Sequence, residues 1–156
     1  MTMIDKLATF CTATSVAASA GTALIGSQID LSTLTSRPGA GQPVYLVILP
    51  TTEIITGGNA GTIRFELASD STASIATDAT ATVICASPTY ATDGTDANDA
   101  QLKVGNVILC QPIDVRRSER YLGIRCVTVT TTTTAGAITA FLTTNPAAYW
   151  AYPNAI

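Results

Sequence analysis

The chain has 156 residues, which suits one domain, and a domain of that size hides roughly 70% of the surface its unfolded chain exposes. Hydrophobic residues make up 47% of the chain and charged residues only 12%, so Thr, Ser, Ala and Gly must cover much of the surface. The net charge is −3 and the eight Lys and Arg form no long basic run, which argues against nucleic acid as a partner.

The four cysteines are scattered along the chain, and no histidine is present. They form no CxxC pair, so the usual zinc spacings are missing. We expect small, buried, reduced side chains, although an even number also permits two disulfides. The residues are Cys11, Cys85, Cys110 and Cys126.

Residues 7–26 resemble the core of a secretory signal ending in an Ala-x-Ala site. Thr and Ser dilute this stretch, Asp5 stands beside Lys6 ahead of it, and no run approaches the ~18 apolar residues of a membrane span. We therefore expect a soluble, unprocessed protein with no membrane partner.

The first element along the chain is a possible helix over Met3–Phe10, where Ile4, Leu7 and Phe10 recur at helical spacing. An extended arm fits the same residues. We assign residues 1–12 to an N-terminal arm or short helix.

The remaining elements are predicted strands, because Thr, Val and Ile saturate the sequence and helical patterns are scarce. Glycine- and proline-rich turns separate them. Two weaker strands are expected near residues 13–19 and 22–31. The clearest are Val44–Pro50, Thr62–Ser69, Ala81–Ala86, Val107–Pro112, Tyr121–Thr130 and Ala137–Thr143.

Two of these strands alternate with a period of two, which predicts one buried and one outer face. Ile63, Phe65 and Leu67 are expected in the core, with Thr62, Arg64 and Glu66 outside. In the later strand the expected core residues are Leu122, Ile124 and Cys126, set against Gly123 and Arg125.

Half-buried alternation is typical of antiparallel sheets, so we predict an all-β, single-domain, jelly-roll-like antiparallel β-sandwich over residues 13–144. The Thr-rich run Val129–Thr134 is interpreted as a solvent-exposed strand end or hairpin, or as a Thr ladder that pairs with a neighbouring subunit. Residues 145–156 form an aromatic C-terminal tail. With the N-terminal arm, it gives the sandwich two extended ends.

Catalysis is not expected, because a chain without histidine cannot build a Ser-His-Asp or Cys-His arrangement. Glu53, Glu66 and Glu119 fall in different segments, beside turns or on expected outer faces, so they do not suggest a carboxylate pair. No cofactor is implied.

An acidic loop offers candidate calcium ligands in Asp93, Asp96 and Asp99. Its order of ligands and glycine is not that of an EF-hand. We favour a loop whose side chains bond their own backbone.

Charge is unevenly distributed: one acidic stretch contains no basic residue, whereas four arginines gather later. Complementary patches between subunits and pairing within the molecule both explain this. The acidic residues are Asp70, Asp78, Asp93, Asp96 and Asp99, and the basic ones are Arg116, Arg117, Arg120 and Arg125.

The tail concentrates Tyr149, Trp150 and Tyr152 within a few residues. Either it folds back over the sandwich, or it anchors in a partner, as aromatic side chains often do. Deleting residues 146–156 would separate these alternatives, since only the first predicts loss of folding.

Ordered blocks along the chain resemble the cement (decoration) proteins of short-tailed phages, such as that of the Bordetella podophage. They are Met3–Leu7, Gly41–Val47, Phe65–Asp70, Arg120–Arg125 and Thr134–Thr143. The resemblance implies a jelly roll that oligomerises, as a dimer or trimer, and bridges subunits of the major capsid protein on the outer surface of the virion. Such a protein is made in the cytoplasm of the host bacterium.

We expect the contacts with the shell or with other subunits in the chain ends and the arginine-rich region. The residues are Met3, Ile4, Lys6, Arg116, Arg117, Arg120, Tyr149, Trp150 and Tyr152. The alternative is a carbohydrate-binding or adhesive jelly-roll module of a phage fibre or tail. A small-virus coat protein fits less well, because no basic arm for the genome is present.

Overall fold

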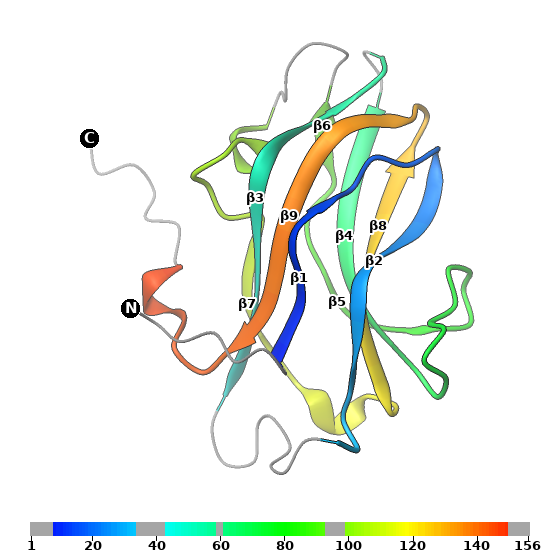
Figure 1. Cartoon of the computed structure of the whole chain (residues 1–156), viewed down its shortest axis with the longest axis vertical. Coiled ribbons are helices and arrows are strands. Elements are labelled where there is room, and N and C mark those ends of the chain that lie inside the picture. The colour runs from blue at the N-terminus through cyan, green and yellow to red at the C-terminus, as the bar shows by residue number, and fades with distance from the viewer. Residues whose placement is uncertain (1–7, 34–42, 59–60, 93–98, 150–156) are drawn as a thin grey trace.

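The computed structural model describes residues 8–33, 43–58, 61–92 and 99–149, which form two packed β-sheets (Figure 1). Three short 3₁₀ turns, η2 (Ala100–Leu102), η3 (Val115–Arg117) and η4 (Pro146–Ala148), follow β6, β7 and β9. The strands are β1 (Thr9–Ser15), β2 (Gly21–Asp30), β3 (Val44–Thr56), β4 (Gly61–Asp70), β5 (Thr82–Ala86), β6 (Tyr90–Thr92), β7 (Leu109–Ile113), β8 (Tyr121–Val129) and β9 (Thr133–Thr143).

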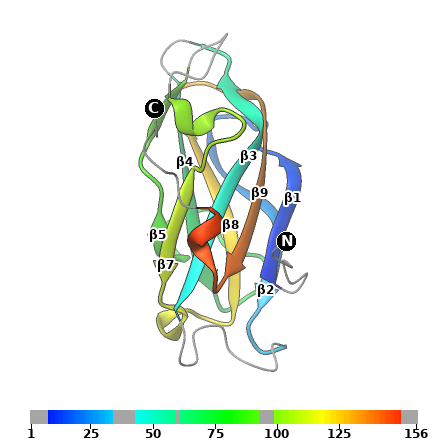
Figure 2. The ribbon, with the colours of Figure 1, turned by 90° about the vertical axis from the view of Figure 1, so that its left-hand side faces the viewer.

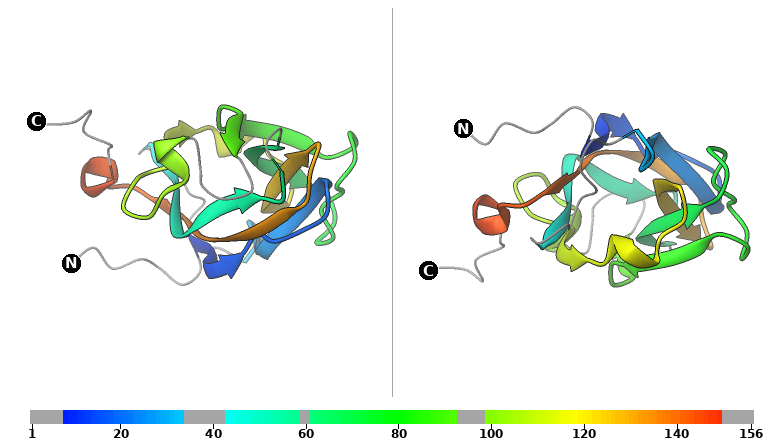
Figure 3. Two further views of the ribbon diagram at one scale, coloured as in Figure 1. Left: turned by 90° about the horizontal axis from the view of Figure 1, so that it is seen from above. Right: turned by 90° about the horizontal axis from the view of Figure 1, so that it is seen from below.

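The two sheets are antiparallel throughout. Sheet A has the strand order β1-β9-β3-β7, and sheet B has the order β2-β8-β4-β5 with β6 also paired to β4. Most connections cross from one sheet to the other, which is the winding of a double-sheet jelly roll. Seen end-on, the sheets enclose the space between them (Figure 3). The prediction of an all-β antiparallel sandwich is confirmed.

The core lies between the sheets and takes the inward residue of each alternating pair. Ile63, Phe65 and Leu67 of β4 are fully buried, as their period of two predicts. The predicted core residues of β8 are buried with them, namely Leu122, Ile124 and Cys126. Burying each large aliphatic or aromatic side chain contributes about 1.5–3 kcal/mol, so this core is the main source of stability.

Several strand boundaries differ from the sequence prediction. Strand β1 begins at Thr9, so the expected arm boundary at residue 12 falls inside a strand. Phe10 lies in that strand and is buried in the core, not on a helix. Strand β3 continues past Pro50 to Thr56, because register shifts let it bend with β9. The three-residue strand β6 has too little pattern to be predicted.

The threonine run crosses between sheets, since β8 lies in sheet B and β9 in sheet A. It is therefore not a hairpin within one sheet. The Oγ1 atoms of Thr128 and Thr133 are both buried and lie 2.9 Å apart. At the same end of β4, the Oγ1 atoms of Thr56 and Thr92 lie 2.5 Å apart. Threonine pairs thus satisfy one another inside the fold.

One long side of the sandwich is closed by contact between β1 and β2 (Figure 1). Gly26 of β2 has φ +72°, and a Cβ there would collide with the Phe10 carbonyl oxygen and the Cys11 side chain. Only glycine permits this backbone and this close approach. The other long side ends in β5 and β7, which lie along the left-hand edge of the molecule in Figure 2.

Candidate interaction surfaces

The described residues contain no cluster of three or more His, Cys, Asp or Glu side chains that could hold a metal ion. Asp93 and Asp96 lie outside the described residues. Asp99 accepts a 2.6 Å hydrogen bond from the Ala91 backbone N–H, so its carboxylate ties the acidic loop to β6. The partner of Asp99 is thus the backbone of a strand and lies outside the acidic segment.

The cysteines described by the structure are all free thiols. Cys11, Cys85 and Cys126 are buried, and Cys110 on β7 is half-buried. Burial raises the pKa of Cys85 and of Cys126 to about 11, because the thiolate loses its hydration. The expectation of small, reduced side chains is confirmed, and the two-disulfide alternative is not.

The arginines at the end of the sandwich near η3 pair within the molecule. Arg116 forms a bidentate pair with Asp114 at 3.0 and 3.1 Å, and Arg120 pairs with Asp30 at 3.1 and 2.8 Å. Arg120 also lies over the Tyr121 ring, 4.9 Å from its centroid. Arg117 belongs to η3. Intramolecular pairing therefore accounts for these two arginines.

Both pairs remain open to solvent. The side chains of Arg116 and Arg120 are 84% and 55% exposed, so each can still meet a partner. The hydrogen bonds from Arg120 hold the pKa of Asp30 far below its usual range. Exposed pairs of this kind add little to stability, because water and salt screen them. At this end of the sandwich, the exposed guanidinium groups of Arg116 and Arg120 are held in place by their carboxylate partners.

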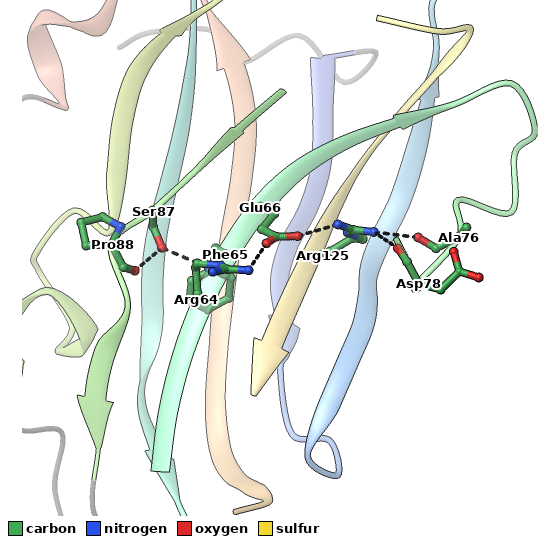
Figure 4. A network of polar contacts seen from close by, with 8 residues as sticks. All are labelled: Arg64, Phe65, Glu66, Ala76, Asp78, Ser87, Pro88 and Arg125. Carbon is green, nitrogen blue, oxygen red and sulfur yellow. Dashed lines mark hydrogen bonds and ion pairs between the residues drawn. The ribbon is translucent and has the colours of Figure 1, made fainter. Parts of the chain in front are cut away.

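The largest departure from the sequence prediction concerns the outer face of sheet B. Glu66 and Arg125 were expected outside, yet their side chains are only 5% and 6% exposed. Arg125 Nη2 donates a 2.6 Å hydrogen bond to Glu66 Oε2, and Arg64 pairs with the other carboxylate oxygen (Figure 4). The Nη1 atom of Arg125 donates to the carbonyl oxygens of Ala76 and Asp78, both at 3.0 Å.

The cover over this network is the connection between β4 and β5, residues 71–81, which we call the 71–81 loop. Its Ile75 is buried in a second small core, packed with Ala68 and Ala81. The loop holds its own shape, because Asp70 accepts hydrogen bonds from the backbone N–H groups of Thr72 and Ala76. The sequence signal that could have revealed it is the apolar Ile75 and Ala76 inside a long polar connection.

The outer face of sheet A is different in character. Among the residues of its four strands only Glu53 is charged. Val47 and Phe141 are opposite each other in the β3–β9 register and alternate with core residues, so they point outward. Tyr45 and Leu49 flank Val47 on the same face and are half-buried. This outward row is apolar, and we call it the sheet A face.

The C-terminal tail begins on the sheet A face. Tyr149 follows η4, and its ring meets that of Phe141 edge-on with 5.1 Å between centroids. Phe141 is 1% exposed and is buried on the side of sheet A that faces away from the main core. The fold-back alternative therefore holds for Tyr149. Met3, Ile4, Lys6, Trp150 and Tyr152 lie outside the described residues.

No helix in the described parts of the chain is long and apolar enough to cross a membrane. Every aromatic side chain of the described strands and turns is buried or half-buried, including Tyr121 beside Arg120. A platform of exposed aromatic rings, which sugar binding would favour, is not formed by these residues.

Comparison with known proteins identifies a family for the chain. A search of curated proteins finds no match. A family model described as Bbp16 matches residues 10–142, which span the sandwich from β1 to β9. The name of that family points to a Bordetella phage protein. Because the match covers most of the chain and both sheets, this protein belongs to the Bbp16 family.

Proposed function

We propose that this protein is a capsid decoration protein, which binds the outer surface of a tailed-phage head and stabilises the shell of major capsid protein. The observation that carries the proposal is the Bbp16-family match across the whole jelly roll. Three of the blocks that resemble cement proteins lie in β4, at the start of β8 and in β9, which are inner strands of the two sheets. A fourth, Gly41–Val47, ends in β3.

The surface chemistry supports a protein that acts by binding. The sheet A face is uncharged apart from Glu53, and such a surface can be desolvated against another protein at low cost. The end near η3 adds Arg116 and Arg120, held in place by Asp114 and Asp30. Guanidinium groups fixed in this way lose little further freedom when they meet carboxylates of a partner.

A decoration protein stabilises its shell by mass action, because it binds the assembled lattice and not the dissociated subunits. Many identical contacts then add through multivalency. The proposed role involves neither direct contact with the genome nor a catalytic step. The partners are the major capsid protein and further copies of this chain, and the location is the outer surface of the virion.

The experiment compares phage heads that carry the protein with heads that lack it. Complete heads are expected to retain DNA to a higher temperature, measured by the fluorescence of a DNA dye during heating. Adding the purified protein back should restore the difference. Equal release temperatures for the two kinds of head would refute the decoration role.

The contact residues are tested with variants of matched charge. Arg116→Glu should weaken co-sedimentation of the protein with heads, whereas Lys103→Glu makes the same charge change beside η2 and should not. Truncation after Tyr149 removes Trp150 and Tyr152 and keeps the contact with Phe141. It should therefore weaken head binding while leaving the melting temperature of the free protein unchanged.

A further inference from the structure

The 71–81 loop covers only part of the outer face of sheet B. Residues directly opposite each other in an antiparallel pair point to the same face, so the strand register extends this face beyond Glu66 and Arg125. Toward the end of β8 the residues of this face are exposed or half-buried. We call them the open half of sheet B, and they are Thr22, Thr62, Arg64, Ala91, Val127 and Val129.

Two valines of β8 give the open half an apolar part. Val129 is 52% exposed, although it is a large hydrophobic side chain. Val127 is half-buried and lies opposite Arg64 on one side and Thr22 on the other. No acidic residue belongs to the open half. Another protein can therefore displace water from most of this surface at low cost.

The charge of the open half comes from Arg64. Glu66 has one carboxylate and pairs with two guanidinium groups, those of Arg64 and Arg125 (Figure 4). These three side chains together carry one positive charge in excess. The side chain of Arg64 is 41% exposed and that of Arg125 only 6%, so the excess charge reaches the surface at Arg64.

Arg64 also keeps unused hydrogen-bonding capacity. A guanidinium group has five N–H donors, and Glu66 is the only acidic partner of Arg64 among the residues that the structure describes. The Nε atom of Arg64 has no hydrogen-bond partner. The carboxylates of Asp70 and Asp78 accept their hydrogen bonds from the 71–81 loop. Arg64 therefore has donors left for a second carboxylate.

We propose that the open half of sheet B binds an acidic segment of the major capsid protein, which places a carboxylate on Arg64 and apolar side chains on Val127 and Val129. Opposite charges across an interface fix its register, and arginine suits carboxylates in particular. This assignment rests on the proposed decoration role and names the chemistry of one partner surface.

The assignment also accounts for bridging between shell subunits. The outer faces of two packed sheets point in opposite directions (Figure 3). The sheet A face and the open half of sheet B therefore contact different neighbours, and two such contacts are what a bridging protein requires.

The test places opposite charges at one exposed position. Val129 follows Val127 by two places on the same face, which makes it a diagonal neighbour of Arg64. The carboxylate of Val129→Glu lies within reach of Arg64 and repels an acidic partner, whereas the ammonium group of Val129→Lys attracts one. The matched controls are Val104→Glu and Val104→Lys, since Val104 is 61% exposed in the connection between η2 and β7.

Dissociation constants are measured by co-sedimentation of the full chain with heads that lack it. The constant for Val129→Glu should rise about tenfold, because like charges repel across the interface. The constant for Val129→Lys should equal the wild-type value or fall below it, and both Val104 variants should match the wild type.

Arg64→Gln gives a second measurement that does not depend on Val129. It leaves Glu66 paired with Arg125, and it should raise the dissociation constant and make that constant less dependent on salt. This variant carries the test if Val129→Glu lowers the melting temperature of the free protein.

Four results would overturn the proposal while wild-type binding leaves the decoration role standing. Unchanged binding by Val129→Glu and Arg64→Gln would show that the open half does not meet the shell. Equal weakening by both Val129 variants would mean a contact without an acidic partner, and weakening by Val129→Lys alone would mean a basic partner. Equal weakening by the Val104 variants would mean a non-specific effect of charge. A wild type that does not bind heads would overturn the decoration role as well.

Discussion

The outer faces of the two sheets are covered in different ways. Sheet B carries Arg64, Glu66 and Arg125 on its outer face and covers Glu66 and Arg125 with the 71–81 loop. The sheet A face has apolar residues and is covered in part by Tyr149, seven residues from the end of the chain. The lesson is that charged groups buried under a cover need hydrogen-bond partners, which the backbone of the loop supplies, whereas apolar residues can pack against an aromatic ring that makes no hydrogen bond.

The largest effect is expected from Arg125→Ala, which breaks the network on sheet B. It leaves Glu66 buried without one of its two arginines and removes the donors to the Ala76 and Asp78 carbonyls. Breaking a buried pair in this way costs about 3–5 kcal/mol of unfolding free energy, measured by urea denaturation. Arg120→Ala is the control, because its pair with Asp30 is exposed and should lose far less. Equal losses would contradict the contrast between buried and exposed pairs.

A smaller effect is expected on sheet A from Tyr149→Ala. This change removes the edge-on contact with Phe141, which should cost about 1 kcal/mol of unfolding free energy by the same method. Tyr149→Phe keeps the ring and should match the wild type. A Tyr149→Ala protein as stable as the wild type would show that the ring covers the face without stabilising it.

Acid should loosen the 71–81 loop before the sheets. The Ala76 N–H lowers the pKa of Asp70, and the Thr80 hydroxyl lowers that of Asp78, both from a usual value of 3.8. A lowered folded pKa stabilises the fold above the unfolded pKa, and this contribution is lost as pH falls through the folded value. Hydrogen exchange, corrected for intrinsic rates, should show the Thr72, Ala76 and Thr80 amides losing protection below about pH 3.8 while β9 stays protected. Protection that does not change with pH would contradict this.

The smallest perturbation is chemical labelling of the thiols, which compares the sheet A face with the core. Cys110 is opposite Val47 on that face and is half-buried, whereas Cys85 and Cys126 are buried. Burial raises the pKa of Cys110, and it raises the pKa of Cys85 and of Cys126 to about 11. Iodoacetamide at pH 8 should therefore label Cys110 first, as read by mass spectrometry. Faster labelling of Cys85 or Cys126 would show that the core opens under native conditions.

The sequence predicted the strands that have a strong pattern and failed where pattern is short or ambiguous. Alternation placed Ile63, Phe65 and Leu67 correctly in the core. The same alternation placed Glu66 and Arg125 in solvent, because a period of two separates two faces but does not say what covers the second. Phe141 shows the converse difficulty, since an apolar side chain does not reveal which face of the sheet buries it.

The candidate contact residues divide in a similar way. Clustering along the sequence identified the arginine-rich end, but it could not show that Asp30, 90 residues before Arg120, would lie against that arginine. The positions of the edge strands gave no sequence signal either. An edge strand has the composition of an interior strand, and only the order of strands in the sheet reveals it.

By itself, the sequence determined that this protein is built from β-strands around one apolar core, because β-branched residues at a period of two satisfy a pleated sheet locally. It also determined a surface poor in charge. Only the tertiary structure decided which strands lie at the edges, which face of each sheet is covered, and which charges are buried as pairs. Those properties depend on contacts between residues far apart in the chain, and local patterns carry no information about them.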